Sequence, residues 1–191
     1  MAITFLSESA AGTTIISDQA YHLAKGRIWI RGEITEELAG NIASQIMWCE
    51  DKDLPVIIYI DSVGGDVVAG LSIIDQMTAA KVPIDVVCTG KAYSMGAIIL
   101  ACGAGEGHRH ILPHAKVMIH QPYTGGVGGT ASNIRERADA LLNAQNTLID
   151  LIAAHTGHTK KMVEKDMGYD HYFSAEEAVK YGLVDDIWEK K

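Results

Sequence analysis

Apolar residues lie along this chain in two kinds of pattern that alternate with each other. The first kind is a short, nearly unbroken run rich in β-branched residues, which is typical of a strand covered on both faces. Such runs lie at residues 55–61 (PVIIYID), 84–90 (IDVVCTG) and 115–120 (AKVMIH), and an alternating run lies at residues 27–34 (RIWIRGEI). These four segments are therefore predicted to be strands.

The second kind of pattern places an apolar residue at helical spacing. Leu38, Ile42 and Ile46 recur every fourth residue, which is one face of a helix. A second helix is expected within residues 62–80, after a turn through two glycines, and a third begins near Ser94. Strand, turn and helix repeat in this order, which predicts an α/β fold with a parallel sheet and crossover helices.

A long amphipathic helix is expected over residues 132–157, and Gly157 is placed to end it. Near the end of the chain, Ser174 and Glu177 match the S-x-x-E capping box, which predicts a last, short helix. The apolar stripe of the long helix consists of Ile134, Ala138, Leu141, Leu142, Leu148, Ile149 and Ile152.

Composition narrows the classes of function. The chain has 191 residues and a formal net charge of −8, which argues against nucleic acid or an anionic membrane surface as its main partner. The cysteines Cys49, Cys88 and Cys102 have no paired spacing, so they are interpreted as core residues in a reducing compartment. The chain has neither a basic secretory leader nor an apolar run of about 18 residues, so a cytoplasmic protein without a membrane segment is expected.

Candidate chemistry centres on Ser94, which lies in the glycine- and alanine-rich run GKAYSMGAIILACGA. Ser94 either caps a packed helix or acts as a nucleophile at the start of that helix. A serine nucleophile needs a base, commonly histidine, that is itself oriented by a carboxylate. His120 ends a predicted strand and suits the base, while Asp170, in a polar turn before the last helix, suits the carboxylate. Asp166 competes with Asp170, and spacing alone does not separate them.

Acyl chemistry also needs donors for a developing oxyanion, usually backbone N–H groups. The N–H of Met95, at a helix start, and that of Gly65, in the SVGGD turn, are the candidates. The glycine-rich loop at residues 123–130 (YTGGVGGT) is either a connector or an extended segment along which a peptide or a neighbouring subunit adds as a strand.

Other chemistries have weaker support. His108, His110 and His114 lie close together, but no cysteine or carboxylate has ligand-like spacing beside them, so no metal is expected. No nucleotide cofactor is expected either, because the phosphate-binding motifs G-x-x-x-x-G-K and G-x-G-x-x-G are absent. The serine motif is not the G-x-S-x-G elbow, since Ala92 stands at the first glycine. A dyad of Ser94 with Lys91 is a minor variant that His120 makes unnecessary.

Several blocks in order, AYSMGA, VMIHQP, SVGGDVVAGLSIIDQM and FSAEEAVKYGLVD, resemble the ClpP family, the proteolytic subunit of the Clp protease, from about residue 25 to 187. The resemblance implies a crotonase-like ββα superhelix with a handle at about 121–157, within one domain, 18–191, that follows an axial segment, 1–17. It also implies the triad and oxyanion donors, which are Ser94, His120, Asp170, Gly65 and Met95. Substrate would lie along Gly125, Gly126 and Val127.

The resemblance further implies a homo-tetradecamer of two stacked heptamers that cuts unfolded polypeptides supplied by a AAA+ unfoldase, without metal or nucleotide in the peptidase. This chain departs from the family pattern at several positions: Val63 replaces a proline and Tyr93 replaces a small residue. Large apolar residues of the unfoldase-docking groove are replaced by Ala79, Thr89 and His110. A divergent member with an altered unfoldase partner, or with none of its own, is therefore expected, and a mixed ring with a paralogue is an alternative.

Two other functions stay open at this point. One is a non-proteolytic crotonase-like enzyme that acts on acyl-CoA thioesters, which would have no need of the serine, histidine and aspartate set. The other is a ClpP-like structural subunit of a mixed ring, which is either catalytically silent, with a misaligned triad, or activated by its partner.

Overall fold

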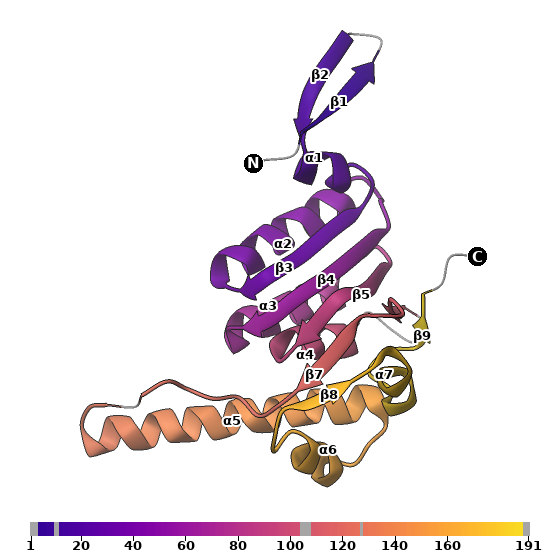
Figure 1. The fold of residues 1–191 in the computed structure, drawn as a ribbon. Helices are drawn as coiled ribbons and strands as arrows, with labels where there is room; N and C mark the ends of the chain where they lie inside the picture. Colours follow the sequence, from indigo (N-terminus) through magenta and orange to yellow (C-terminus); the bar gives the residue numbers. More distant parts are fainter. Residues whose placement is uncertain (1–3, 10–11, 104–107, 127, 189–191) are drawn as a thin grey trace.

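The computed structural model describes residues 4–9, 12–103, 108–126 and 128–188, and its centre is a mostly parallel, seven-stranded sheet (Figure 1). Its strands follow the order β3-β4-β5-β6-β9, while β7 continues beside β5 and pairs in turn with β8, the one antiparallel neighbour. The strands are β3 (Arg27–Ile34), β4 (Val56–Gly65), β5 (Ile84–Tyr93), β6 (Arg109–Ile111), β7 (Lys116–Ile119), β8 (His171–Phe173) and β9 (Asp186–Ile187). The prediction of an α/β fold with a mostly parallel sheet is confirmed.

Seven helices lie within the described ranges, and six of them begin at a side chain that accepts a hydrogen bond from the first turn. The exception is α4, which follows Ser94 and has no such cap. The predicted capping box of Ser174 and Glu177 is present at α7. The helices are α1 (Asp18–Leu23), α2 (Glu36–Glu50), α3 (Val67–Ala79), α4 (Met95–Ala101), α5 (Ala131–Thr156), α6 (Lys160–Asp166) and α7 (Ala175–Tyr181).

The core lies between the sheet and the helices α2, α3 and α4. Ile42 and Ile46, on the predicted face of α2, are fully buried, as is Ile73 on α3. The whole of α4 is buried, which is why its sequence is apolar on every side. All three cysteines are buried and free, so their interpretation as core residues is confirmed. Burial raises the pKa of the Cys88 and Cys102 thiols to about 12.

One local prediction is wrong. The expected turn through Gly64 and Gly65 is strand, because β4 continues to Gly65 and pairs with the end of β3. Val63 is the extra residue of a bulge in β4, which shifts the register between Gly32 and Glu33 of β3. The bulge turns the end of β4 toward the start of α4, where Ser94 lies.

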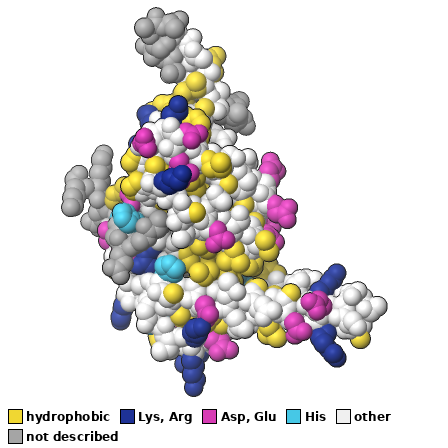
Figure 2. Space-filling view, turned by 180° about the vertical axis from the view of Figure 1, so that it is seen from behind, with side chains coloured by type: hydrophobic (Ala, Val, Ile, Leu, Met, Phe, Trp, Pro, Cys, Tyr) yellow, Lys and Arg dark blue, Asp and Glu magenta, His cyan; other side chains and the backbone are white. Residues whose placement is uncertain are grey.

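The long helix α5 forms an arm that extends well beyond the sheet, with the chain that precedes it alongside (Figure 1). Only the C-terminal part of its predicted apolar stripe is buried, at Leu148, Ile149 and Ile152. Ile134 and Leu142, farther out, are 42% and 56% exposed. Figure 2 shows positive and negative side chains on the outer part of the arm. The single chain therefore leaves part of an apolar stripe uncovered.

The N-terminal segment contains an antiparallel hairpin, β1 (Thr4–Ser9) and β2 (Gly12–Ser17), that projects from the end of the molecule opposite the arm (Figure 1). The ring of Phe5 in this hairpin stacks on the ring of Tyr21 in α1, with 4.2 Å between the ring centroids. Among the described residues, no helix is both long enough and apolar enough to span a membrane.

Candidate active site

Ser94 stands at the junction of β5 and α4 in a backbone conformation that L-residues rarely adopt, with φ 53° and ψ −124°. Its N–H donates to the carbonyl of Met118 on β7, which holds the junction in place. The hydroxyl makes no capping bond to α4. The interpretation of Ser94 as a simple helix cap is therefore wrong, and its Oγ is available to another group.

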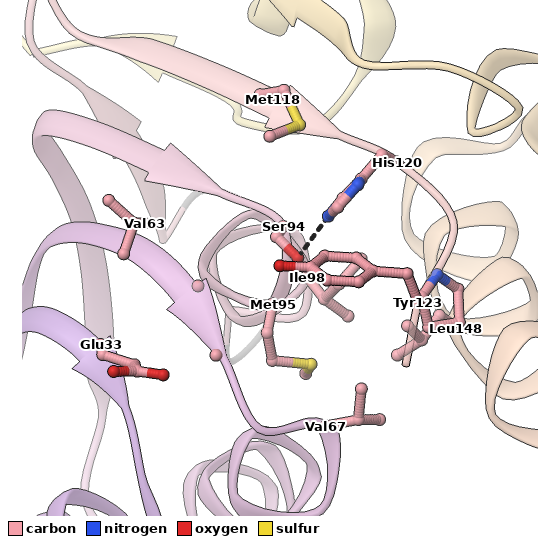
Figure 3. Close-up of a pocket in the computed structure, with 13 residues that line it drawn as sticks. Glu33, Val63, Val67, Ser94, Met95, Ile98, Met118, His120, Tyr123 and Leu148 are labelled. Carbon is pink, nitrogen blue, oxygen red and sulfur yellow. Dashed lines mark hydrogen bonds between the residues drawn. The ribbon is translucent and has the colours of Figure 1, made fainter. Parts of the chain in front are cut away.

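That group is His120, which follows β7 directly. His120 Nε2 lies 2.8 Å from Ser94 Oγ, and Figure 3 shows the imidazole pointing down onto the hydroxyl. The chain beyond His120 is anchored by the N–H of Gln121, which donates to the carbonyl of Met167 at 2.7 Å. A base within hydrogen-bond reach of a serine hydroxyl is the arrangement that activates it as a nucleophile.

Asp170 approaches the other nitrogen of the same ring. Its Oδ1 lies 3.5 Å from His120 Nδ1, and its side chain is 60% exposed, compared with 15% for His120. The competing carboxylate, Asp166, has a different partner: it accepts a hydrogen bond from the hydroxyl of Tyr181 at 2.9 Å. Burial raises the pKa of Tyr181, and the bond to Asp166 raises it further. The geometry therefore separates the two aspartates that spacing did not.

The candidate oxyanion donors lie on the same side of the cleft. The N–H of Met95 is the first of α4, and the first N–H groups of a helix have no partner within it. A β-carbon on Gly64 would lie 2.6 Å from Ser94 Cβ and 3.1 Å from Met95 N, and one on Gly65 would lie 2.3 Å from the carbonyl oxygen of Ile34. Both positions have positive φ, so β4 passes this close to Ser94 at Gly64, and to Ile34 at Gly65, only with glycine there.

The bulge that presents these glycines is held by Ser62, which is fully buried. Its hydroxyl donates to the carbonyl of Gly32 at 2.6 Å and accepts from the N–H of Gly64 at 3.0 Å. One side chain thus ties the end of β3 to the strand that faces Ser94. Nothing in the sequence analysis singled out Ser62, although its place before two glycines was a usable signal.

One cleft of about 400 Å³ is lined by Ser94, His120 and both candidate oxyanion donors, Gly65 and Met95 (Figure 3). Tyr123, 79% exposed, lies at its mouth, with its ring centroid 5.8 Å from that of His120. Glu33 was not predicted as a residue of the site, and Tyr123 was predicted only as the first residue of the loop 123–130. The cleft is lined by Glu33, Val63, Gly64, Gly65, Val67, Ser94, Met95, Ile98, Met118, His120, Pro122, Tyr123 and Leu148.

Val63 and Tyr93, the two residues near Ser94 that depart from the family pattern, differ in whether they line the cleft. Val63 is half-exposed and lines the cleft. Tyr93 packs edge-on against Tyr172 of β8, with 5.6 Å between ring centroids, and is not among the described residues that line the cleft. The tyrosine ring therefore packs behind Ser94 and does not narrow the cleft.

The residues predicted to bind substrate lie in the segment after His120. Gly125 and Gly126 belong to an exposed loop, and the described residues there form no strand, since no second strand lies beside them to pair with. Val127 lies outside the described residues. The substrate-binding role of these three positions stays a prediction.

Two histidines outside the cleft, His108 and His110, pair with carboxylates. His108 Nδ1 lies 2.5 Å from Asp85 Oδ1, and His110 Nδ1 lies 2.7 Å from Asp186 Oδ1. Within the described ranges, no three or more His, Cys, Asp and Glu side chains are grouped to hold a metal ion. These pairs lie at the opposite end of β5 from Ser94, beside β6 and β9.

The three altered positions of the expected docking groove are spread over that end of the sheet. Ala79 ends α3, and Thr89 on β5 uses its hydroxyl to donate to the carbonyl of Ile60 at 3.1 Å. His110 packs against Trp188, whose ring in turn stacks parallel to that of Tyr59 at 6.3 Å between centroids. Whether an unfoldase docks there stays a prediction.

The family described as Clp protease matches residues 11–191, which is nearly the whole chain.

Proposed function

The chain belongs to the Clp protease family, and from this premise we propose that it is a serine endopeptidase in which Ser94, His120 and Asp170 form the catalytic triad. The observation that carries the proposal is the 2.8 Å contact between His120 Nε2 and Ser94 Oγ at an uncapped helix start. The substrate is an unfolded polypeptide, which is cut to short peptides. No metal or nucleotide takes part in the proposed peptidase step.

The proposed reaction has two halves. His120 Nε2 takes the proton of Ser94 as Oγ attacks the substrate carbonyl, and the N–H groups of Gly65 and Met95 stabilise the oxyanion that forms. His120 then gives its proton to the leaving amine as the C–N bond breaks. In the second half, water attacks the acyl-enzyme ester, passes a proton to His120, and Ser94 recovers it as the acid leaves. Asp170 keeps the Nδ1–H of His120 turned toward itself throughout.

The proposed assembly is a pair of stacked seven-membered rings that encloses the active sites. The uncovered apolar residues on the outer part of α5, among them Leu142, support it, because a second copy of this arm would bury them. The segment of residues 121–157 is then the handle between rings, within a crotonase-like superhelix. The proposed partner at the axial end is a AAA+ unfoldase, with a paralogous ring as the variant that the altered docking positions favour.

A second candidate is a subunit whose triad becomes active only in a mixed ring or with an activator. The observation that favours it is the 3.5 Å separation of His120 and Asp170, which is longer than a hydrogen bond of 2.7–3.2 Å. Catalytic hydrogen bonds are often long in the free enzyme and shorten when substrate binds, so this separation is also compatible with an active enzyme. The oligomeric state in which activity is found decides between the two.

The test is size-exclusion chromatography of the full chain, with a fluorogenic short-peptide assay on each peak. We expect activity in a large species and its loss in Ser94→Ala of unchanged size. A large wild-type species without activity, which a paralogue or unfoldase then activates, would support the second candidate. Turnover of an acyl-CoA thioester that is insensitive to Ser94→Ala would overturn both in favour of a non-proteolytic crotonase-like enzyme.

A further inference from the structure

We propose that Glu33 makes this active site selective for peptides with a lysine or arginine side chain within two residues of the bond that is cut. The inference rests on the proposed function, because it names the substrate class of the same cleft. Its basis is the position of one unpaired carboxylate relative to Ser94 and to the apolar walls between them.

The end of β3 places Glu33 beside the catalytic machinery. Glu33 and Gly64 are direct partners across β3 and β4, so their backbones lie about 4.8 Å apart. The β-carbon position of Gly64 in turn touches Ser94. Since residue 64 has no side chain, nothing at that position separates the Glu33 carboxylate from the cleft. In Figure 3 the carboxylate points from β3 into the cleft, with Ser94 and His120 across from it.

The nearest basic residue on β3 is occupied elsewhere. Arg31 would face the same side of the strand as Glu33, but its guanidinium lies 3.8 Å from the ring centroid of Trp29 and 3.8 Å from Asp18 Oδ2. Among the residues that the structure describes, none forms a hydrogen bond or ion pair with the Glu33 carboxylate. The Glu33 carboxylate therefore has no internal partner among the described residues, and the net charge of −8 adds to the attraction for cations.

The walls of the cleft suit a long basic side chain. Lysine and arginine bury their methylene stems along apolar surface and keep the charged end beside a polar group. Glu33 is the one carboxylate among the described residues that line the cleft, where the other titratable side chains are those of His120 and Tyr123. The apolar walls are formed by Val63, Val67, Met95, Ile98, Met118 and Leu148.

The reach of the substrate limits where the basic residue can stand. Successive residues of an extended peptide are about 3.3 Å apart. With its carbonyl at Ser94, such a peptide brings side chains one or two residues from the cut bond within reach of the end of β3. An uncharged residue of the same length at that position gains the apolar contacts but not the ion pair.

The test uses peptides with acetylated and amidated ends, so that the variable side chain is the only added charge. Lysine, arginine, norleucine and glutamate are placed in turn at the two positions on each side of the cut bond, and kcat/KM is measured by mass spectrometry. For the wild type we expect lysine or arginine to be preferred over norleucine by about fivefold at one position. Salt at high concentration should reduce this ratio, because the ion pair is open to solvent.

Variants of Glu33 supply the decisive comparison. Glu33→Gln should bring the ratio to about one, Glu33→Asp should keep part of it, and Glu33→Lys should make the glutamate peptide better than the lysine peptide. The matched control is Asp61→Asn, which removes an exposed carboxylate from the neighbouring strand outside the cleft and should leave the ratio unchanged.

Two results would overturn the inference. One is a wild-type enzyme that cuts norleucine peptides as well as lysine peptides at every position. The other is a lysine preference that survives in Glu33→Gln. If the assembled wild type cuts none of the peptides, norleucine included, the proposed function itself fails, so the two failures are distinguishable.

Discussion

Two pairs of a basic and an acidic side chain in this molecule are built very differently. Arg109 and Asp185 are nearly buried, with side chains 9% and 19% exposed, and the guanidinium forms a fork on the carboxylate. Its remaining nitrogen donates to the carbonyls of Ala101, His155 and Gly182. His120 and Asp170 meet at a single 3.5 Å contact, and the carboxylate is mostly in water.

The difference indicates what each pair does. A buried charge is tolerated when every donor has an acceptor, and the Arg109 pair joins the ends of α4, α5 and α7 to β6 through such contacts. In the proposed mechanism His120 has to exchange protons and adjust to a substrate, which a saturated pair would prevent. The first pair therefore stabilises the fold, and the second leaves the ring of His120 able to respond at Ser94.

Breaking the buried pair should have the largest effect. Arg109→Leu leaves the Asp185 carboxylate without its guanidinium partner and three carbonyls without a donor, so we expect the free energy of unfolding to fall by about 3–5 kcal/mol. Urea unfolding at fixed protein concentration measures it. Arg135→Leu, at an exposed position on α5, is the control and should cost less than about 0.5 kcal/mol. A loss below about 1 kcal/mol for Arg109→Leu would contradict the structural role of this pair.

Breaking the more exposed pair, His120 and Asp170, should reduce activity and leave stability almost unchanged. Asp170→Asn should reduce peptidase kcat by about 100-fold, which is about 2.7 kcal/mol of transition-state stabilisation, because the amide no longer stabilises the charged form of His120. The melting temperature should change little, since Asp170 is largely exposed. In the matched control, Asp166→Asn, kcat should stay within about twofold of the wild type. If Asp166→Asn had the larger effect on kcat, the assignment of the carboxylate would be wrong.

Tyr181→Phe tests whether Asp166 contributes to the stability of the fold and not to catalysis. The variant removes one hydrogen bond, between the Tyr181 hydroxyl and Asp166, so a loss of about 1 kcal/mol in stability with unchanged kcat is expected. Thermal unfolding and the peptide assay, run on the same preparation, provide both values. Lower activity at unchanged stability would mean that this pair, too, acts on the site.

The smallest effect concerns pH. Burial raises the pKa of Cys88 and Cys102 to about 12, so the unfolded chain loses these protons at lower pH than the folded chain does. Stability from these thiols is therefore complete below their ordinary pKa and falls as pH rises from about 9 toward 12, by about 0.4 kcal/mol per thiol at pH 9. Both should resist a thiol-specific reagent at pH 8 in the folded protein and react after unfolding. Rapid modification of folded Cys88 would contradict their burial.

Local patterns were sufficient for most of the fold. Four strands and the long helix begin and end within a few residues of their predicted limits, because burial on two faces and helical periodicity are both written in neighbouring residues. The short strands β6, β8 and β9 were not predicted, since they are held by pairing with distant segments. The Arg109–Asp185 pair joins residues 76 positions apart, so no local pattern reveals it.

The candidate site was only partly predictable from local patterns. Strand ends and helix starts indicated Ser94, His120 and Met95, and the structure brings these residues together. The choice of Asp170 over Asp166 depended on the family resemblance, because the hydrogen bond from Tyr181 to Asp166 is a tertiary contact. Glu33 was missed since the bulge at Val63, which brings the end of β3 beside Ser94, follows from pairing between β3 and β4.

The central claim is that Ser94 is a nucleophile activated by His120. The most direct measurement is incubation of the assembled wild-type protein with an alkyl fluorophosphonate, followed by peptide mapping by mass spectrometry. The claim predicts one phosphonyl group on Ser94, and none on the His120→Ala variant under the same conditions. An assembled protein that cuts peptides while Ser94 stays unmodified, or that is labelled at Ser94 equally well without His120, would contradict it.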